Sequence, residues 1–160
     1  MPAFLCDAML GGLAGWLRAA GYDTVWKNDI PDGVLLARAL SEGRTILTSD
    51  SEFARRRAVR DRLVPCLFIP RDLPPVQALR HVIAALGLTL LPPRCMACGG
   101  ELLVVDKSSV RDLVGAVAYS RHEDFWRCAR CRKVYWRGTH WTRIKRALEE
   151  AAPPLPSPPP

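Results

Sequence analysis

The segment "TILTSDSEFARRR" (residues 45–57) begins as a short β-branched apolar run and then changes abruptly to acidic and basic residues. Its first part, "TILT", is typical of a buried strand, and Asp50 follows closely. In an open α/β sheet, ligands bind at the carboxyl ends of the strands. An acid at this position makes it important to know whether the neighbouring strands end in the same way.

Strand-like and helix-like patterns alternate along the first part of the chain. The expected strands cover residues 3–6, 23–26, 45–48 and 65–69. The expected helices cover residues 9–21, 31–43, 51–62 and 74–87. Short apolar strands that alternate with amphipathic helices predict an α/β domain in which helices flank a parallel, Rossmann-like sheet. We place this domain at residues 1–91.

Acidic residues follow three of the expected strands. Asp7, Asp29 and Asp50 each lie just beyond the carboxyl end of a strand. Because parallel strands end at one edge, we expect the three carboxylates to converge and to hold Mg²⁺ or Mn²⁺, which favour oxygen ligands. Such an ion can activate water and stabilise the charge on a phosphate during its transfer, so these acids are the candidate catalytic residues.

Two of the acids also have a structural interpretation. Asp29 could cap a helix that begins near Pro31, and Ser49 with Glu52 fits a capping box that starts the helix after Asp50. The recurrence of acids on three strands favours the metal site over these alternatives. A fourth acid cannot be selected by spacing among Asp32, Glu42, Glu52 and Asp72.

Two Cys-x-x-Cys pairs, "CMAC" (95–98) and "CARC" (128–131), lie in the second part of the chain with 29 residues between them. Each pair can present two thiolates from one tight turn, and two such turns supply the tetrahedral sulfur set of a zinc site. The expected Zn²⁺ ligands are Cys95, Cys98, Cys128 and Cys131. A thioredoxin-like redox site would need one pair rather than two matched ones. Four thiolates leave no open position for water, so we expect this zinc to be structural.

The sequence around the cysteine pairs predicts a zinc ribbon at residues 92–146. Strand-like runs at 101–106 and 133–136 follow the two turns. A module of this size buries little apolar surface, and a bound metal compensates for that deficit. The remaining residues, 147–160, are rich in proline and predict an extended or disordered tail.

Basic residues are concentrated in the second module. Residues 94–146 contain 12 Lys and Arg against 5 Asp and Glu, which gives +7, whereas residues 1–93 contain 11 against 9, which gives +2. A basic surface favours polyanions, of which nucleic acid is the foremost candidate. The expected contacts to RNA are Arg55, Arg56, Arg132, Lys133, Trp136 and His140. In the alternative interpretation, the expected basic helix at residues 51–62 is only a solvated face, and the aromatic residues form the small core of the ribbon.

The beginning of the sequence does not resemble a secretory signal. Its apolar stretch has no basic start and is interrupted by Asp7 and Arg18. No long uncharged run is present, so we expect no membrane span. We therefore expect a cytoplasmic protein, because paired cysteines in a reducing compartment bind metal more often than they form disulfides.

Several segments taken together resemble the Mut7-C RNase family. They are "CDAMLGGLAGWLRAAGYDT" (6–24), "LLARALSEGRTILTSD" (35–50), "RCMACGGEL" (94–102) and "FWRCARCRKVYWRGTHW" (125–141). The resemblance extends from about residue 3 to residue 146. It implies a PIN-like nuclease domain fused to a C-terminal zinc ribbon, and metal-dependent cleavage of RNA by carboxylates at the strand ends.

By position, Asp7 and Asp50 match the acids of the family best, and Asp29 matches less closely because loop lengths vary there. Arg18 matches the arginine of the Trp-Leu-Arg segment, and the resemblance implies that it binds phosphate or anchors an acid. PIN nucleases typically have a fourth acid, which is not evident in this chain. That departure leaves open a weak nuclease, or one whose site is completed by the substrate or a partner chain.

Three functions follow from these patterns. The first is a Mg²⁺- or Mn²⁺-dependent ribonuclease that hydrolyses single-stranded RNA. The second is a non-catalytic RNA-binding zinc-ribbon protein. The third is a phosphotransfer or phosphatase domain in which Asp7 is itself phosphorylated. RNA is the expected partner in the first two cases, and a homodimer is compatible with the sequence without being indicated by it.

Overall fold

A four-stranded parallel sheet organises the first part of the chain. The computed structural model describes residues 1–55, 59, 61 and 63–152. The strands are β1 (Phe4–Cys6), β2 (Thr24–Trp26), β3 (Thr45–Thr48) and β4 (Cys66–Phe68). They lie in the order β2-β1-β3-β4, and every neighbouring pair is parallel. The α/β class predicted from the sequence is confirmed.

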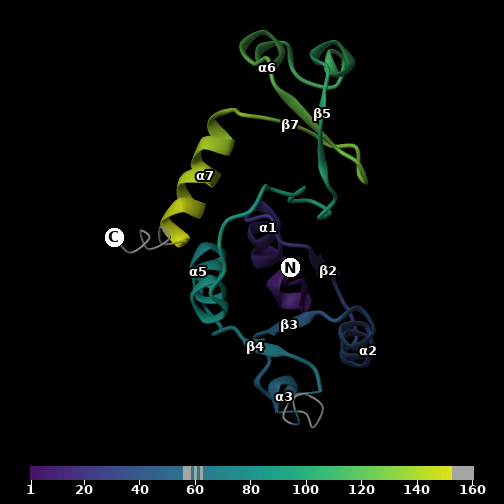
Figure 1. Ribbon diagram of the computed structural model, residues 1–160, viewed down its shortest axis with the longest axis vertical. Helices are drawn as coiled ribbons and strands as arrows, with labels where there is room; N and C mark the ends of the chain where they lie inside the picture. The colour runs from purple at the N-terminus through teal and green to yellow at the C-terminus, as the bar shows by residue number, and fades with distance from the viewer. Residues whose placement is uncertain (56–58, 60, 62, 153–160) are drawn as a thin grey trace, which may run out of the picture.

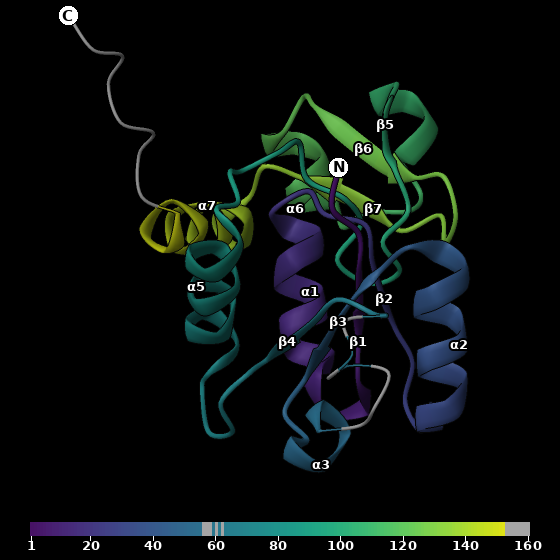
Figure 2. The same cartoon turned by 60° about the horizontal axis from the view of Figure 1, so that its bottom comes forward.

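Helices cover both faces of this sheet (Figures 1 and 2). They are η1 (Ala8–Leu10), α1 (Gly11–Ala19), α2 (Asp32–Glu42), α3 (Ser51–Ala54) and α5 (Pro75–Leu86). On one face, Phe4, Cys6 and Leu47 share a core with α1 and α5. On the other face, Leu5 and Ile46 share a core with α2 and α3. Because successive strand residues point to opposite faces, β1 and β3 contribute to both cores.

Local sequence explains where two of these helices begin and end. Pro75 is the first residue of α5, where its missing N–H has no intrahelical partner to lose. Gly43 and Gly87 follow the last residues of α2 and α5 in the left-handed conformation, with φ angles of 62° and 60°. Glycine adopts this conformation without steric cost, so both helices stop at these positions.

The other two helices differ from the sequence prediction. The helix expected at 9–21 is divided, because residues 8–10 form the 3₁₀ turn η1 before α1 begins. Within the helix expected at 51–62, the structure assigns Ser51–Ala54 to α3. Arg56, one of the expected RNA contacts, lies outside the described residues.

The second part of the chain forms a three-stranded antiparallel sheet. Its strands are β5 (Leu102–Val105), β6 (Phe125–Cys128) and β7 (Val134–Trp136), in that order. The runs expected to be strands correspond to β5 and β7, whereas the sequence pattern does not predict β6. The insertion between β5 and β6 contains the 3₁₀ turn η2 (Lys107–Val110) and the helix α6 (Ala116–Arg121).

A long helix, α7 (Thr139–Ala151), leaves the ribbon and lies against α5 of the parallel-sheet domain (Figure 1). Ile144 and Leu148 are buried in the same core as α1 and α5. The two helices are also joined by a hydrogen bond of 2.8 Å from the Arg80 guanidinium to the Glu150 carbonyl. The returning helix therefore completes the core of the first domain.

This helix corrects the domain boundary expected after residue 146. Residues 147–151 belong to α7 rather than to an extended tail. The apolar residues of α7 recur at helical spacing, and that spacing is enough to bury one side of the helix. Residues 153–160, the rest of the expected tail, lie outside the described residues.

The ribbon lies at the end of the parallel sheet opposite the carboxyl ends of its strands (Figure 2). Asp7 and Asp50 follow the carboxyl ends of β1 and β3. The segment leading to the ribbon instead contacts the last turn of α1, where the Arg94 N–H donates to the Arg18 carbonyl at 2.9 Å. Helix α1 and the turn before it separate the two ends by about 20 Å, at roughly 1.5 Å per helical residue and 2.0 Å per 3₁₀ residue.

Candidate metal centre and acidic edge

The cysteines of the two pairs converge in one cluster. Their four sulfur atoms all lie within 4.8 Å of one another. The Sγ atoms of Cys95 and Cys131 are 3.5 Å apart, and those of Cys98 and Cys128 are 3.4 Å apart. Four sulfurs that each bind zinc at about 2.3 Å lie at separations of this order. The cluster can therefore bind a metal such as zinc.

Backbone groups around the cluster favour ionised sulfur. The Gly100 N–H donates to Cys98 Sγ, and the N–H groups of Arg130 and Cys131 donate to Cys128 Sγ, each at 3.4 Å. A Cβ atom at position 100 would lie 2.7 Å from Cys128 Sγ. Only glycine permits so close an approach, so this turn is shaped around the sulfur atoms.

Burial and hydrogen bonds shift the pKa values of the cysteines in opposite directions. Burial opposes ionisation of Cys95, but hydrogen bonds, first of all that from the Tyr135 hydroxyl, bring its pKa down to about 6. Although the Lys133 backbone N–H favours the thiolate of Cys131, burial and the neighbouring sulfurs raise the pKa of Cys131 to about 12. Four thiolates this close repel one another, so all four ionise together only when a cation neutralises them.

Arg18 joins the cysteine turn to the parallel-sheet domain. Its Nε donates to the Thr24 carbonyl at 2.9 Å, and its Nη1 donates to the carbonyls of Met96 and Ala97 at 3.0 Å. Met96 and Ala97 are the two residues between the first pair of cysteines. The Arg18 residue is only 5% exposed. The buried guanidinium thus ties the metal-binding turn to α1 and to the start of β2.

This placement corrects the expectation that Arg18 binds phosphate or anchors an acid. Its described hydrogen bonds all go to backbone carbonyl oxygens, and it lies at the end of α1 that faces the ribbon. Arg18 follows Asp7 by about three helical turns, at roughly 3.6 residues per turn, and that spacing indicates that it lies at the far end of α1 from the acids.

Asp7 is held firmly at the carboxyl end of β1. Its Oδ2 accepts hydrogen bonds from the Thr48 hydroxyl at 2.5 Å and from the Ser49 N–H at 3.0 Å. Its Oδ1 accepts from the Met9 N–H at 3.0 Å and thereby caps η1. These bonds join the end of β1 to the end of β3 and orient the carboxylate.

Asp50 lies beside Asp7 through a shared hydroxyl group. The Asp50 N–H donates to Thr48 Oγ1 at 3.0 Å, and that hydroxyl donates to Asp7. Asp50 Oδ1 accepts from the Glu52 N–H at 2.8 Å, so Asp50 itself caps α3. The capping box expected from Ser49 and Glu52 is therefore replaced by an Asp50 cap, which engages one carboxylate oxygen.

Asp29 occupies the third position of the edge, after β2. It is exposed and has a φ angle of 55°. It does not cap α2, because the residue before that helix is Pro31 and no side chain caps it. Strand β2 neighbours β1, which neighbours β3, so the three acids follow adjacent strands. In the described part of the chain, however, only the cysteines form a group of three or more ligands compact enough to hold an ion.

Two candidates for a fourth acid are separated by the structure. Asp72 follows β4, the next strand beyond β3, and it too has a positive φ angle, of 65°. Glu42 instead lies at the last turn of α2, where it forms ion pairs with Arg38 and Arg44. Glu42 is therefore remote from the acidic edge, whereas Asp72 extends that edge to the fourth strand.

A comparison with protein-family models matches residues 2–148 to the Mut7-C RNAse domain. The match includes the parallel sheet, the cysteine cluster and most of α7. The chain belongs to the Mut7-C RNAse domain family. No curated protein and no solved structure matches the chain. The resemblance seen in the sequence is thus confirmed for nearly all of the described Mut7-C chain.

Two arginines accompany the acidic edge of this Mut7-C chain. Arg55, one of the expected RNA contacts, is exposed immediately after α3. Arg71 follows β4 and donates from Nε to the Ser49 carbonyl at 3.0 Å. The sequence reasoning overlooked Arg71, although its position after a strand is the same signal that selects the acids. Both guanidinium groups can attract a phosphate backbone.

The expected RNA contacts of the ribbon are divided between exposed and packed positions. Arg132, Lys133 and His140 are exposed. Trp136 is half-buried, and its ring centroid lies 6.4 Å from that of the buried Phe125. This contact supports the alternative interpretation of Trp136, in which it belongs to the small aromatic core of the Mut7-C ribbon.

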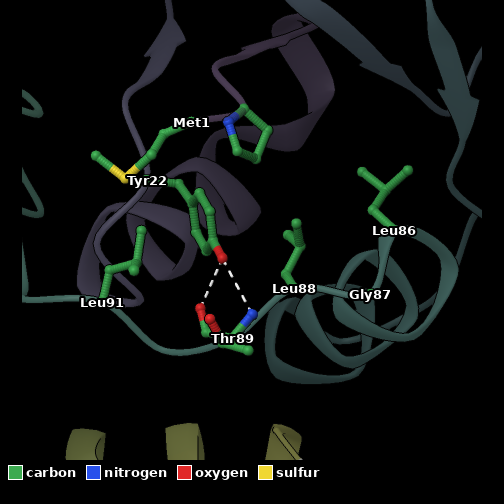
Figure 3. A pocket seen from close by; sticks show the side chains of 8 residues that line it. Met1, Tyr22, Leu86, Gly87, Leu88, Thr89 and Leu91 are labelled. Atoms are coloured by element: carbon green, nitrogen blue, oxygen red, sulfur yellow. Dashed lines mark hydrogen bonds between the residues drawn. The ribbon is translucent and has the colours of Figure 1, made fainter.

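A shallow apolar pocket of about 290 Å³ lies between the start of the chain and the end of α5 (Figure 3). Its lining residues are Met1, Pro2, Tyr22, Leu86, Gly87, Leu88, Thr89 and Leu91. The Tyr22 hydroxyl donates to the Thr89 carbonyl at 2.6 Å and accepts from the Thr89 N–H at 3.2 Å. The pocket has no charged side chain in its lining.

Among the residues that the structure describes, no helix of this Mut7-C chain has both the length and the apolar character needed to cross a bilayer.

Proposed function

We propose that this chain is a metal-dependent ribonuclease with a PIN-like catalytic domain, which hydrolyses phosphodiester bonds of single-stranded RNA. The designation of its family supports RNA as the substrate. The observation that carries the proposal is the position of Asp29, Asp7 and Asp50 after three adjacent parallel strands. In open α/β sheets this edge is where ligands bind and react.

The donor set of the acidic edge fits a hard divalent cation. Asp29 and the Oδ2 atom of Asp50 have no hydrogen-bond partner among the described residues, and Asp7 is oriented by Thr48 and Ser49. Mg²⁺ and Mn²⁺ prefer such carboxylate oxygens. When bound, the ion supplies Lewis-acid activation of water and stabilises the charge that develops on the phosphate.

The protein's own groups would orient the reaction. The hydrogen-bonded series from the Asp50 N–H through the Thr48 hydroxyl to Asp7 holds two of the proposed ligands in register. Arg55 and Arg71 would bind phosphate groups of the RNA backbone near the scissile bond. Guanidinium groups form strong paired hydrogen bonds with phosphate. Asp72 is the fourth acid that we assign to the site.

We infer that the cysteine cluster holds a structural Zn²⁺ ion. The four sulfurs fill a tetrahedral coordination sphere and leave no position for substrate. Through Arg18 the ion would stabilise the parallel-sheet domain, about 20 Å from the proposed chemistry by the helical rise of α1. Its role is then to support the fold rather than to activate water.

A non-catalytic RNA-binding protein is the second candidate function. It is favoured by the finding that the three carboxylates do not form a compact ligand group among the described residues. No specific observation favours phosphotransfer through Asp7.

Cleavage of a labelled single-stranded RNA in the presence of Mn²⁺ tests the proposal. We expect cleavage by the wild-type chain and its loss in Asp7→Asn, measured at a temperature where the variant is folded, because asparagine replaces only part of the three hydrogen bonds that Asp7 accepts. Asp112→Asn, which neutralises an exposed acid of the ribbon insertion, is the matched control and should cleave normally. Calorimetric titration with Mn²⁺ should show binding that Asp7→Asn abolishes. Cleavage by Asp7→Asn at the wild-type rate would rule out the assigned site.

A further inference from the structure

One face of the ribbon sheet combines aromatic and basic side chains. The antiparallel register places Val104 of β5 opposite Trp126 of β6, and Trp126 opposite Tyr135 of β7. Alternate residues along a strand share a face, so Lys133 and Arg137 flank Tyr135 on the same side. We call the set Val104, Trp126, Lys133, Tyr135 and Arg137 the Trp126 face.

The two cations of this face lie over its two aromatic rings. The Arg137 Cζ atom is 5.1 Å from the centroid of the Trp126 ring, and the Lys133 Nζ atom is 5.9 Å from that of Tyr135. Both basic residues are exposed, and neither is paired with an acid within the described part of the chain. Their charges are therefore free to interact with a polyanion.

The Trp126 face is open around Val104 and Trp126, while its Tyr135 hydroxyl lies 3.0 Å from Cys95 Sγ, and the other face of the same sheet is closed. Val104 is 77% exposed, and Trp126 is half-buried. On the opposite face, Phe125 is fully buried between the rings of Tyr119 and Trp136, each with its centroid 6.4 Å away. The alternation along β6 thus exposes Trp126 and withdraws its neighbour Phe125 from solvent.

We propose that the Trp126 face binds single-stranded RNA, with unpaired bases stacked against Trp126 and Arg137 and the phosphate backbone following Lys133. The choice of RNA rests on the proposed function. Aromatic rings beside unpaired cations suit single strands, because exposed bases stack while their phosphates are neutralised. Bases within a duplex cannot stack on a side chain in this way.

Charge supports a nucleic acid over a protein partner at this face. Residues 94–146 contain 12 basic and 5 acidic residues, a net +7. Val104 is the exposed aliphatic residue of the Trp126 face, and Leu102, two residues earlier on the same side of β5, is half-buried, so the face lacks the broad apolar centre that stable protein interfaces use. A flexible polyanion with flat bases matches both the charge and the rings.

The position of the face gives it a role in holding the substrate. The ribbon lies beyond the end of α1 that is remote from Asp7, about 20 Å away by helical rise. A strand bound at both places must span that distance. Loss of the Trp126 face should therefore raise KM for long substrates and leave kcat, and the cleavage of short substrates, nearly unchanged.

Fluorescence anisotropy with a labelled single-stranded oligouridine tests the proposal on the full chain, with zinc bound and no other divalent ion added. Trp126→Ala should weaken binding about 5- to 150-fold, the range measured for one stacked base. Trp126→Phe should restore most of the affinity. Arg137→Ala should weaken binding and lower the salt dependence by about one phosphate contact. Arg143→Ala removes an exposed cation on α7, outside the face, and should have little effect.

Zinc content and thermal stability establish that each variant is folded. Wild-type affinity in Trp126→Ala, or equal affinity of the wild-type chain for oligouridine and for a duplex, would overturn the proposal. If Trp126→Ala loses zinc, the affinities of Trp126→Phe and Arg137→Ala decide in its place. Near wild-type affinity in Trp126→Phe with weakened binding in Arg137→Ala supports the site, and wild-type affinity in Arg137→Ala contradicts it. If binding depends on Trp126 but the chain does not cleave RNA in Mn²⁺, the proposed nuclease function is wrong and the proposed RNA-binding site is still supported.

Discussion

Replacing Arg18 by methionine tests whether the ribbon and the parallel-sheet domain fold as one unit. The guanidinium makes three hydrogen bonds, to the carbonyls of Thr24, Met96 and Ala97, and the residue is 5% exposed. Methionine has a similar aliphatic stem, but it leaves all three carbonyl oxygens without their donor. The substitution therefore removes the connection with little change in packing.

The expected loss of stability follows from these three bonds. A hydrogen bond from a charged donor contributes roughly 1.5–3 kcal/mol when it is buried. The bonds to Met96 and Ala97 are only partly buried, so water can replace part of what they lose. We expect the free energy of unfolding to fall by about 3–5 kcal/mol, a large share of the roughly 5–15 kcal/mol that stabilises a typical domain.

Urea unfolding followed with two probes measures this effect. Tryptophan fluorescence reports mainly on packing, and a chromophoric chelator reports on release of the metal from the cysteine cluster. If Arg18 couples the two parts, both signals should change in one transition, and Arg18→Met should lower both midpoints together. Arg38→Met is the matched control, because it removes a surface ion pair with Glu42 that contributes about 1 kcal/mol or less.

Two results would refute this reasoning. One is a loss of less than about 1 kcal/mol in Arg18→Met, which would mean that the three carbonyls find other donors at little cost. The other is release of the metal well before the fluorescence change in the wild-type chain, which would make the ribbon an independent unit.

Three other perturbations give distinct expected outcomes. Gly100→Ala forces a methyl group against a ligand sulfur and should weaken zinc binding at least tenfold in a chelator competition, whereas Gly115→Ala, with nothing within 4 Å of its Cβ, should not. Leu148→Ala should cost about 2–4 kcal/mol in urea unfolding, because α7 closes the first core. Burial, aided by the charge of Asp7, raises the pKa of Cys66 to about 11, so its protonated thiol should resist alkylation in mildly alkaline buffer. The stability linked to that thiol should decline as the pH rises toward 11, and Asp7→Asn should lower the pKa and hasten alkylation detected by peptide mass mapping.

The parallel sheet could be predicted because its signals are local. Short apolar runs bounded by Pro, Gly and acids locate all four strands, and φ-permissive glycines after α2 and α5 locate two helix ends. The same patterns do not predict that Asp50 rather than Ser49 caps α3. The choice depends on Thr48, whose hydroxyl binds both the Asp50 N–H and Asp7 on the neighbouring strand.

The aromatic residues of the ribbon show why residue type alone is insufficient. Trp136 and Trp126 lie in the same basic, tryptophan-rich segment, and the sequence prediction selected Trp136. The register of β6 with β7 places Trp136 beside the buried Phe125 and places Trp126 on the open face beneath Arg137. Successive residues of a strand point to opposite faces of the sheet. Which of them is exposed therefore depends on how the strand pairs and packs with its neighbours.

The sequence by itself determined the chemical groups and their local setting. It contains two matched cysteine pairs, acids after successive strands and a basic second module, and these depend only on residue identity and short-range spacing. Tertiary structure alone decided which groups meet. It brought Arg18 to the cysteine turn, returned α7 to the first core and placed the ribbon opposite the acidic edge. These contacts join residues far apart in the chain, and their free energy comes from burial and hydrogen bonds that form only when the whole chain has folded.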